Sequence, residues 1–119
     1  FNFEKLLVWQ KSLSLADQIY RLTRSFPLEE RFGLSSQMRR AAVSISSNIA
    51  EGASRHSRVD YSRFVEIAAG SLFELVSQTT IARNQGLLTA SEYTQIYASS
   101  LEILRMLTGL RSSLERARS

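Results

Sequence analysis

The sequence has 119 residues, a net charge of +4, a pI near 10.0 and 44% hydrophobic residues, which suits one globular domain and excludes a disordered chain. Cysteine is absent, which excludes disulfides, thiolate metal ligands and thiol nucleophiles and fits a reducing compartment such as the cytoplasm. We therefore expect a single domain over residues 1–119.

Helical spacing of apolar residues predicts a first helix near the N-terminus. One row is followed by a second that widens the apolar face: Leu6, Trp9, Leu13, Ala16 and Tyr20, then Leu15, Ile19, Leu22 and Phe26. Pro27 disfavours helical geometry in the residue before it, so this helix is expected to end at Phe26. Residues 28–33 then form a connector.

A second helix is expected from about Ser35 to Glu51, and Gly52 stands where it could end the helix. Its core face is predicted to contain Met38, Ala42, Ile45 and Ile49. Many other side chains in this segment are small, which predicts that a neighbouring backbone approaches closely.

Capping signals delimit two longer helices. Ser57, with Asp60 three residues later, predicts the start of a third helix that continues to about residue 85. Gly86 predicts a left-handed C-terminal cap, and Thr89 with Glu92 predicts a capping box at the start of a fourth helix. Each of these helices has about 28 residues, hence a length of roughly 40 Å.

These elements predict an all-α fold, an antiparallel up-down-up-down four-helix bundle, because short connectors favour antiparallel neighbours. Gly70 and Gly109 fall in the middle of the third and fourth helices. Glycine destabilises a helix interior by about 1 kcal/mol relative to alanine, so we expect a compensating close contact at both positions.

The sequence contains no motif typical of catalysis, such as a Gly-rich phosphate loop, HExxH or GxSxG. His56 is the only histidine and stands between Arg55 and Arg58, as expected for a solvated loop residue. Carboxylates near it lack the Glu-x-x-His pairs of a bundle metal centre. We therefore expect no enzymatic activity, no cofactor and no metal.

No apolar run approaches the ~20 residues needed to cross a bilayer, so no membrane partner is expected. The N-terminal FNFEKLLVWQK lacks the basic start and the small-residue cleavage site of a signal peptide. The sequence begins with Phe1 rather than Met, which leaves open what precedes it.

Basic charge is localised between residues 39 and 63, where five arginines stand against Glu51 and Asp60, an excess of three charges out of +4. Such clustering is typical of phosphate contacts, which give sequence-independent, salt-sensitive affinity for nucleic acid. No aromatic residues interleave with these arginines as in RNA-binding motifs. The candidate nucleic-acid contacts are Arg39, Arg40, Arg55, Arg58 and Arg63.

Three segments resemble one known family: NFEKLLVWQKS at 2–12, FPLEERFGLSSQMRRAAVSISSNIAEGASR at 26–55 and FVEIAAGSLFELVSQ at 64–78. The chain is similar to the four-helix-bundle proteins encoded in intervening sequences of bacterial 23S ribosomal RNA genes. These proteins are also called S23 ribosomal proteins and are related to the accessory variability protein of diversity-generating retroelements. Residence in an rRNA gene is not evidence of a place in the ribosome.

The resemblance implies a ring-like homopentamer and, by analogy with the retroelement relatives, association with nucleic acid and reverse transcriptase. The positions that match the family motif are Arg39, Arg40, Asn48, Glu51, Gly52 and Gly70. For Asn48 and Glu51 we expect a structural role, because they share a helix face where they could cap or pair. Ser46 replaces a common proline of the motif, which should soften any kink in the second helix.

Two functional hypotheses follow. The first is a non-enzymatic, homo-oligomeric scaffold that associates with RNA or DNA through its arginines. The alternative is a structural or adaptor protein that binds a protein partner, with its arginines committed to ion pairs within the assembly. Salt-dependent binding of nucleic acid distinguishes the two hypotheses.

Overall fold

The computed structural model describes residues 1–116, and four helices dominate this part of the chain. They are α1 (Leu7–Thr23), α2 (Leu34–Ala53), α3 (Arg58–Asn84) and α4 (Ala90–Arg116). Two short 3-10 turns, η1 (Asn2–Lys5) and η2 (Leu28–Glu30), precede α1 and α2, and the described residues contain no strand.

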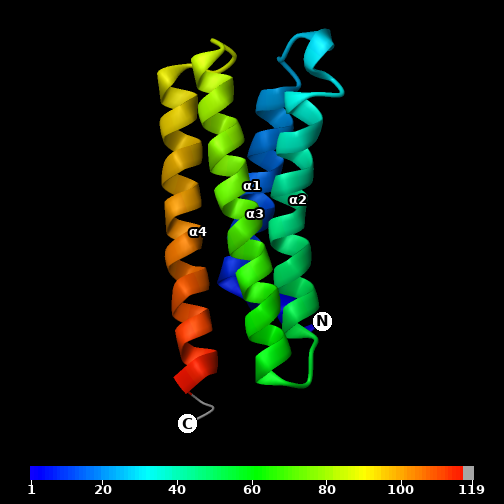
Figure 1. Cartoon of the computed structure of the whole chain (residues 1–119), viewed down its shortest axis with the longest axis vertical. Coiled ribbons are helices and arrows are strands. Elements are labelled where there is room, and N and C mark those ends of the chain that lie inside the picture. Colours follow the sequence, from blue (N-terminus) through cyan, green and yellow to red (C-terminus); the bar gives the residue numbers. More distant parts are fainter. Residues whose placement is uncertain (117–119) are drawn as a thin grey trace.

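The helices run up, down, up and down as an antiparallel bundle (Figure 1). Each helix packs against the one before it in the chain, and α4 also packs against α1, so the four helices enclose one core. The bundle measures 49 × 21 × 20 Å. Its upper end in Figure 1 carries the α1–α2 and α3–α4 connections, and its lower end carries the α2–α3 connection. The predicted fold class is confirmed.

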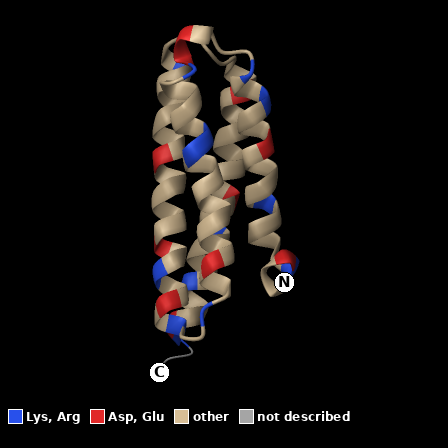
Figure 2. Ribbon diagram, turned by 90° about the vertical axis from the view of Figure 1, so that its right-hand side faces the viewer, with Lys and Arg blue, Asp and Glu red and all other residues tan. Residues whose placement is uncertain are grey.

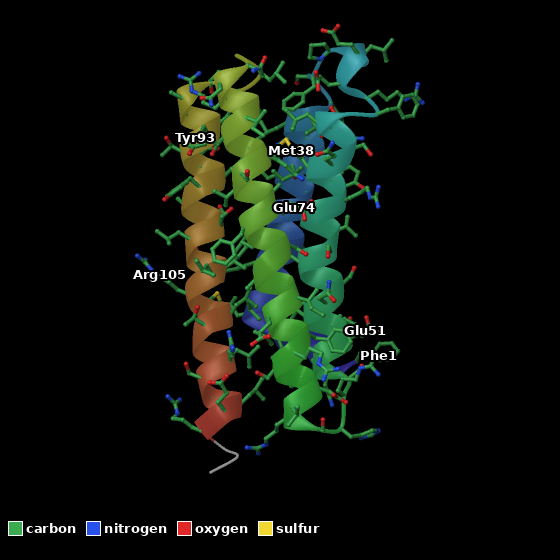
Figure 3. The ribbon with its side chains drawn as sticks, viewed as in Figure 1. Phe1, Met38, Glu51, Glu74, Tyr93 and Arg105 are labelled. Atoms are coloured by element: carbon green, nitrogen blue, oxygen red, sulfur yellow. The ribbon has the colours of Figure 1, made fainter. Side chains whose placement is uncertain are left out.

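The core consists of large aliphatic side chains from all four helices, and Figure 3 shows Met38 pointing into the bundle, while Arg105 points away from α4 into solvent. Leu13 and Tyr20 belong to the predicted apolar face of α1 but are each 37% exposed. The largest fully buried side chains include Leu15, Ile19, Met38, Ile45, Ile49, Leu72, Leu75, Ile96, Ile103 and Leu107.

The first helix ends at Thr23, three residues earlier than Pro27 alone predicts. The Thr23 hydroxyl donates to the Ile19 carbonyl at 2.7 Å, and the Phe26 amide bonds the Thr23 carbonyl at 3.1 Å in a tight turn. Phe26 therefore reaches the core from outside the helix, where it is 8% exposed. A proline limits where a helix can continue, but hydrogen bonds between these residues end it sooner.

The predicted N-terminal caps of α3 and α4 are present. The Ser57 Oγ accepts the Asp60 amide at 3.0 Å. At the start of α4 the box is reciprocal: the Glu92 amide donates to the Thr89 Oγ1 at 3.1 Å, and the Thr89 amide donates to the Glu92 Oε1 at 2.8 Å. Each cap satisfies backbone amides that the first helical turn leaves without a partner.

The predicted left-handed cap is also present, because Gly86 has a φ of +76°. The Leu87 amide bonds the Ala82 carbonyl at 2.9 Å, and the Gly86 amide bonds the Arg83 carbonyl at 3.0 Å. This pair of bonds is the Schellman motif, which ends α3 and turns the chain toward α4.

The other glycines correct two expectations. Gly52 does not end α2 but lies inside it, where an added Cβ would stand 2.7 Å from the Phe64 Cβ. This glycine allows α2 and α3 to approach closely at the lower end. At Gly70 and Gly109 an added Cβ would meet nothing within 4 Å, so the predicted close contacts are wrong for the chain's own fold. Both glycines lie on exposed faces of their helices.

Candidate nucleic-acid interface

The five predicted arginines do not form one cluster. Arg39 and Arg40 lie in the upper part of α2, whereas Arg55, Arg58 and Arg63 surround the α2–α3 connection. At 1.5 Å per residue the two groups are separated by roughly 20 Å along α2. Figure 2 shows basic positions in the upper half and around the lower end. This separation exceeds the Debye length of roughly 8 Å at physiological salt, so each group of arginines attracts anions independently of the other.

Arg39 is held by uncharged groups of α1. Its Nε donates to the Thr23 Oγ1 at 2.8 Å and its Nη2 to the Tyr20 carbonyl at 3.4 Å. The guanidinium also lies over the Tyr20 ring, with Cζ 4.6 Å from the ring centroid. None of these partners carries negative charge, so the position of Arg39 is fixed and its positive charge is not neutralised.

Arg55 is held differently, by an ion pair. Its Nη2 lies 2.8 Å from the Glu51 Oε1, and its guanidinium lies 4.7 Å from the centroid of the Phe64 ring. Both side chains of the pair are about half exposed, so solvent screens their attraction and the pair contributes at most about 1 kcal/mol. The pair nonetheless cancels the charge of Arg55 as seen from a distance.

Three of the predicted arginines extend into solvent. Arg40, Arg58 and Arg63 are exposed, and none makes a hydrogen bond or ion pair with the described residues 1–116. Arg58 and Arg63 lie in the first two turns of α3. These three side chains can meet a phosphate without first breaking an internal contact.

The motif residues on α2 make structural contacts. The Asn48 Nδ2 donates to the Ser44 carbonyl at 2.8 Å and to the Ser44 Oγ at 3.0 Å. The Ser44 Oγ also shares a 2.8 Å hydrogen bond with the Ser71 Oγ, which links α2 to α3. Glu51 pairs with Arg55, and Figure 3 shows it near the lower end of α2.

The close contact between α2 and α3 around Gly52, which we call the lower joint, also contains aromatic rings. Tyr61 packs beside Gly52, where an added Cβ would stand 3.2 Å from the Tyr61 Cδ1. Burial at this joint raises the pKa of the Tyr61 phenol above its ordinary value of 10.0, because the phenolate would lose hydration. Burial in the lower joint therefore favours the neutral form of the Tyr61 side chain.

The structure contains a groove that the sequence patterns do not predict. It lies between α1 and α2 at the upper end, has a volume of about 700 Å³, and brings Arg31 and Phe32 of the connector next to Arg39. Aromatic residues thus interleave with arginines in space although they do not in sequence. The full lining is Tyr20, Arg31, Phe32, Ser36, Arg39, Arg40, Val43 and Ser44.

A second groove, between α3 and α4, is apolar and has a volume of about 200 Å³. Phe73 on its rim is 59% exposed, and the Ser100 Oγ is buried without a hydrogen-bond partner among the described residues. Its lining is Leu72, Phe73, Val76, Tyr97, Ser100, Leu101 and Leu104.

The described residues offer no metal centre and no membrane span. They contain no group of three or more His, Cys, Asp or Glu side chains that could hold a metal ion. Glu66 pairs instead with Arg111 of α4, and His56 is exposed in the α2–α3 connection. None of the helices in residues 1–116 combines the length and the apolar character needed to cross a bilayer.

The fold defines a class, the small antiparallel four-helix-bundle proteins. The family model of the 23S rRNA-intervening sequence protein matches residues 4–109, so the chain belongs to this family.

A similar solved structure is the crystal structure of a protein of unknown function from the S23 ribosomal protein family of Bacteroides thetaiotaomicron. It is 28% identical with a TM-score of 0.83, covering 89% of this chain and 96% of that chain. No curated protein matches the sequence.

Proposed function

We propose that the protein is a non-enzymatic, homo-oligomeric scaffold that associates with nucleic acid through its arginine surface. The observation that supports this proposal best is the set of exposed arginines that make no hydrogen bond or ion pair within residues 1–116, namely Arg40, Arg58 and Arg63. A pentamer is the assembly that the family resemblance implies.

Self-association has separate support in the apolar groove between α3 and α4. Phe73, Tyr97 and Leu101 leave apolar surface in water, and a contiguous exposed patch of this kind typically marks an interaction site. A second copy that covers the groove would remove this surface from water and could supply a partner for the Ser100 hydroxyl.

The nucleic-acid part is tested by fluorescence anisotropy with labelled RNA and DNA, single-stranded and duplex, over a salt series. We expect the logarithm of the binding constant to fall linearly with the logarithm of salt, by about 0.9 per phosphate contact for duplex DNA. Absence of salt-dependent binding near physiological salt would contradict the proposal.

Charge-reversal variants locate the contact. The double variant Arg58→Glu, Arg63→Glu should weaken binding by at least about tenfold, because each substitution replaces an attraction to phosphate with a repulsion. The matched control is the double variant Arg21→Glu, Arg105→Glu, which makes the same change in net charge at exposed arginines of α1 and α4, and Figure 3 shows Arg105 pointing away from the bundle. An equal effect of this control would mean that only net charge matters.

The self-association part is tested by multi-angle light scattering. The double variant Phe73→Asp, Tyr97→Asp should lower the mass of the assembly, whereas Leu28→Asp, at an 80% exposed residue of the α1–α2 connector, should not. An unchanged mass in the groove variant would exclude this face as the subunit contact.

The alternative, an adaptor that binds a protein partner, is favoured by Arg55, whose guanidinium is already paired with the Glu51 carboxylate within the bundle. A clean oligomer without salt-dependent binding to any nucleic acid would support the adaptor.

A further inference from the structure

The groove between α1 and α2 combines two kinds of side chain that together bind unpaired nucleotides. Phe32 stands on its rim with 88% of its surface exposed, and the Arg31 guanidinium lies 5.3 Å from the ring centroid. Tyr20 and Arg39 form a second arginine–aromatic pair in the same groove. A flat, exposed ring gains most when another flat apolar surface covers it.

The second pair is preorganised. Arg39 cannot swing freely, because the Thr23 hydroxyl and the Tyr20 carbonyl hold it, and the Thr23 hydroxyl is itself fixed to α1 by its bond to the Ile19 carbonyl. The guanidinium also lies over the Tyr20 ring, with Cζ 4.6 Å from the ring centroid. A group already held in place loses little conformational entropy on binding.

The charge of the groove favours an anion. Its lining contains three arginines, Arg31, Arg39 and Arg40, and no carboxylate. The nearby Glu30 is turned toward the start of α2, where its Oε1 accepts the Leu34 amide at 3.3 Å. Glu29 is exposed in η2 and does not line the groove. A volume of about 700 Å³ lies within the range typical of small-ligand sites.

We propose that this groove binds an unpaired nucleotide of single-stranded nucleic acid, with the base stacked on Phe32 and the flanking phosphates bound by Arg31 and Arg40. This inference rests on the proposed function. It adds that the groove at the upper end prefers single-stranded to double-stranded nucleic acid. In a duplex the base faces are covered by their neighbours, so only an unpaired base offers a face to Phe32.

The test compares Phe32→Ala with the wild type for a labelled uridine oligonucleotide of about 15 residues and for an RNA duplex of the same length. Affinity for the single strand should fall about 5- to 100-fold, because one stacked base is lost. Affinity for the duplex and both salt slopes should stay unchanged. Phe32→Tyr keeps an aromatic ring and should restore single-strand binding.

The control is Leu28→Ala, which removes another exposed apolar side chain of the α1–α2 connector that does not line this groove. The inference is overturned if Phe32→Ala leaves single-strand affinity unchanged, weakens duplex binding equally, or changes the mass of the assembly by light scattering. The last outcome would assign Phe32 to a protein contact. Failure of the wild type to bind any nucleic acid would overturn the proposed function as well, so the two failures are distinguishable.

Discussion

The two ends of α2 hold an arginine in opposite ways. At the upper end Arg39 is fixed by a hydroxyl, a carbonyl and an aromatic ring, all uncharged. At the lower end Arg55 is fixed by the carboxylate of Glu51. Both side chains are anchored, but only Arg39 keeps a charge that a phosphate can use at full strength. A count of arginines therefore overstates the positive charge at the lower end, where Glu51 neutralises one of the three, but not at the upper end.

The largest expected effect concerns the joint at the lower end. Gly52→Ala would place a Cβ 2.7 Å from the Phe64 Cβ, an atom too close to its backbone to move freely. We expect a loss of about 2 kcal/mol in the free energy of unfolding, measured by urea denaturation at fixed protein concentration. The same substitution at Gly109 meets open space and should stabilise the protein by about 0.5–1 kcal/mol. Equal effects would mean that the close approach at Gly52 is not required.

The next largest effect comes from replacing Arg39 and Arg55, which tests directly whether the two arginines are held differently. Arg39→Gln should lower the free energy of unfolding by about 1 kcal/mol, because it removes two side-chain hydrogen bonds and a cation–π contact. Arg55→Gln should cost less, because its exposed ion pair is screened. Nucleic-acid affinity should fall more for Arg39→Gln than for Arg55→Gln.

Arg40→Gln is the control for this pair, since Arg40 is exposed and makes no hydrogen bond or ion pair with the part of the chain that the structure describes. It should leave stability within about 0.5 kcal/mol of the wild type. A larger affinity loss in Arg55→Gln than in Arg39→Gln would contradict the inference that Arg39 offers a phosphate more usable charge than Arg55 does.

The distance along the chain between contacting residues explains which features could be predicted from the sequence. The turn around Gly86 and the box of Thr89 and Glu92 follow from residues within seven positions of one another, and both are present as predicted. The contact of Arg39 with Thr23 spans 16 positions, so no local pattern announces it. The upper groove is formed by residues of α1, the connector and α2, whose meeting depends on how the helices pack.

Gly52 and Gly70 show that a match to the family motif does not reveal what surrounds a residue. Both glycines match the family pattern, yet one lies in a tight helix contact and the other faces open space. Spacing along a helix tells which residues share a face but not which neighbour covers that face. The arginines were likewise identified by charge alone, whereas their availability depends on the neutral or acidic character of their partners.

The smallest expected effect again concerns the lower end, and it depends on pH. Burial raises the pKa of Tyr61 above 10.0, so the folded protein holds the phenol in its neutral form more strongly than the unfolded chain does. The stability that this preference contributes is fully present below about pH 10 and is lost as the pH rises through the folded-state pKa. Denaturation midpoints measured between about pH 9 and about pH 11 should therefore fall more steeply for the wild type than for Tyr61→Phe. Parallel curves would mean that the phenolate is tolerated beside Gly52, and the lower joint would then be looser than its contacts indicate.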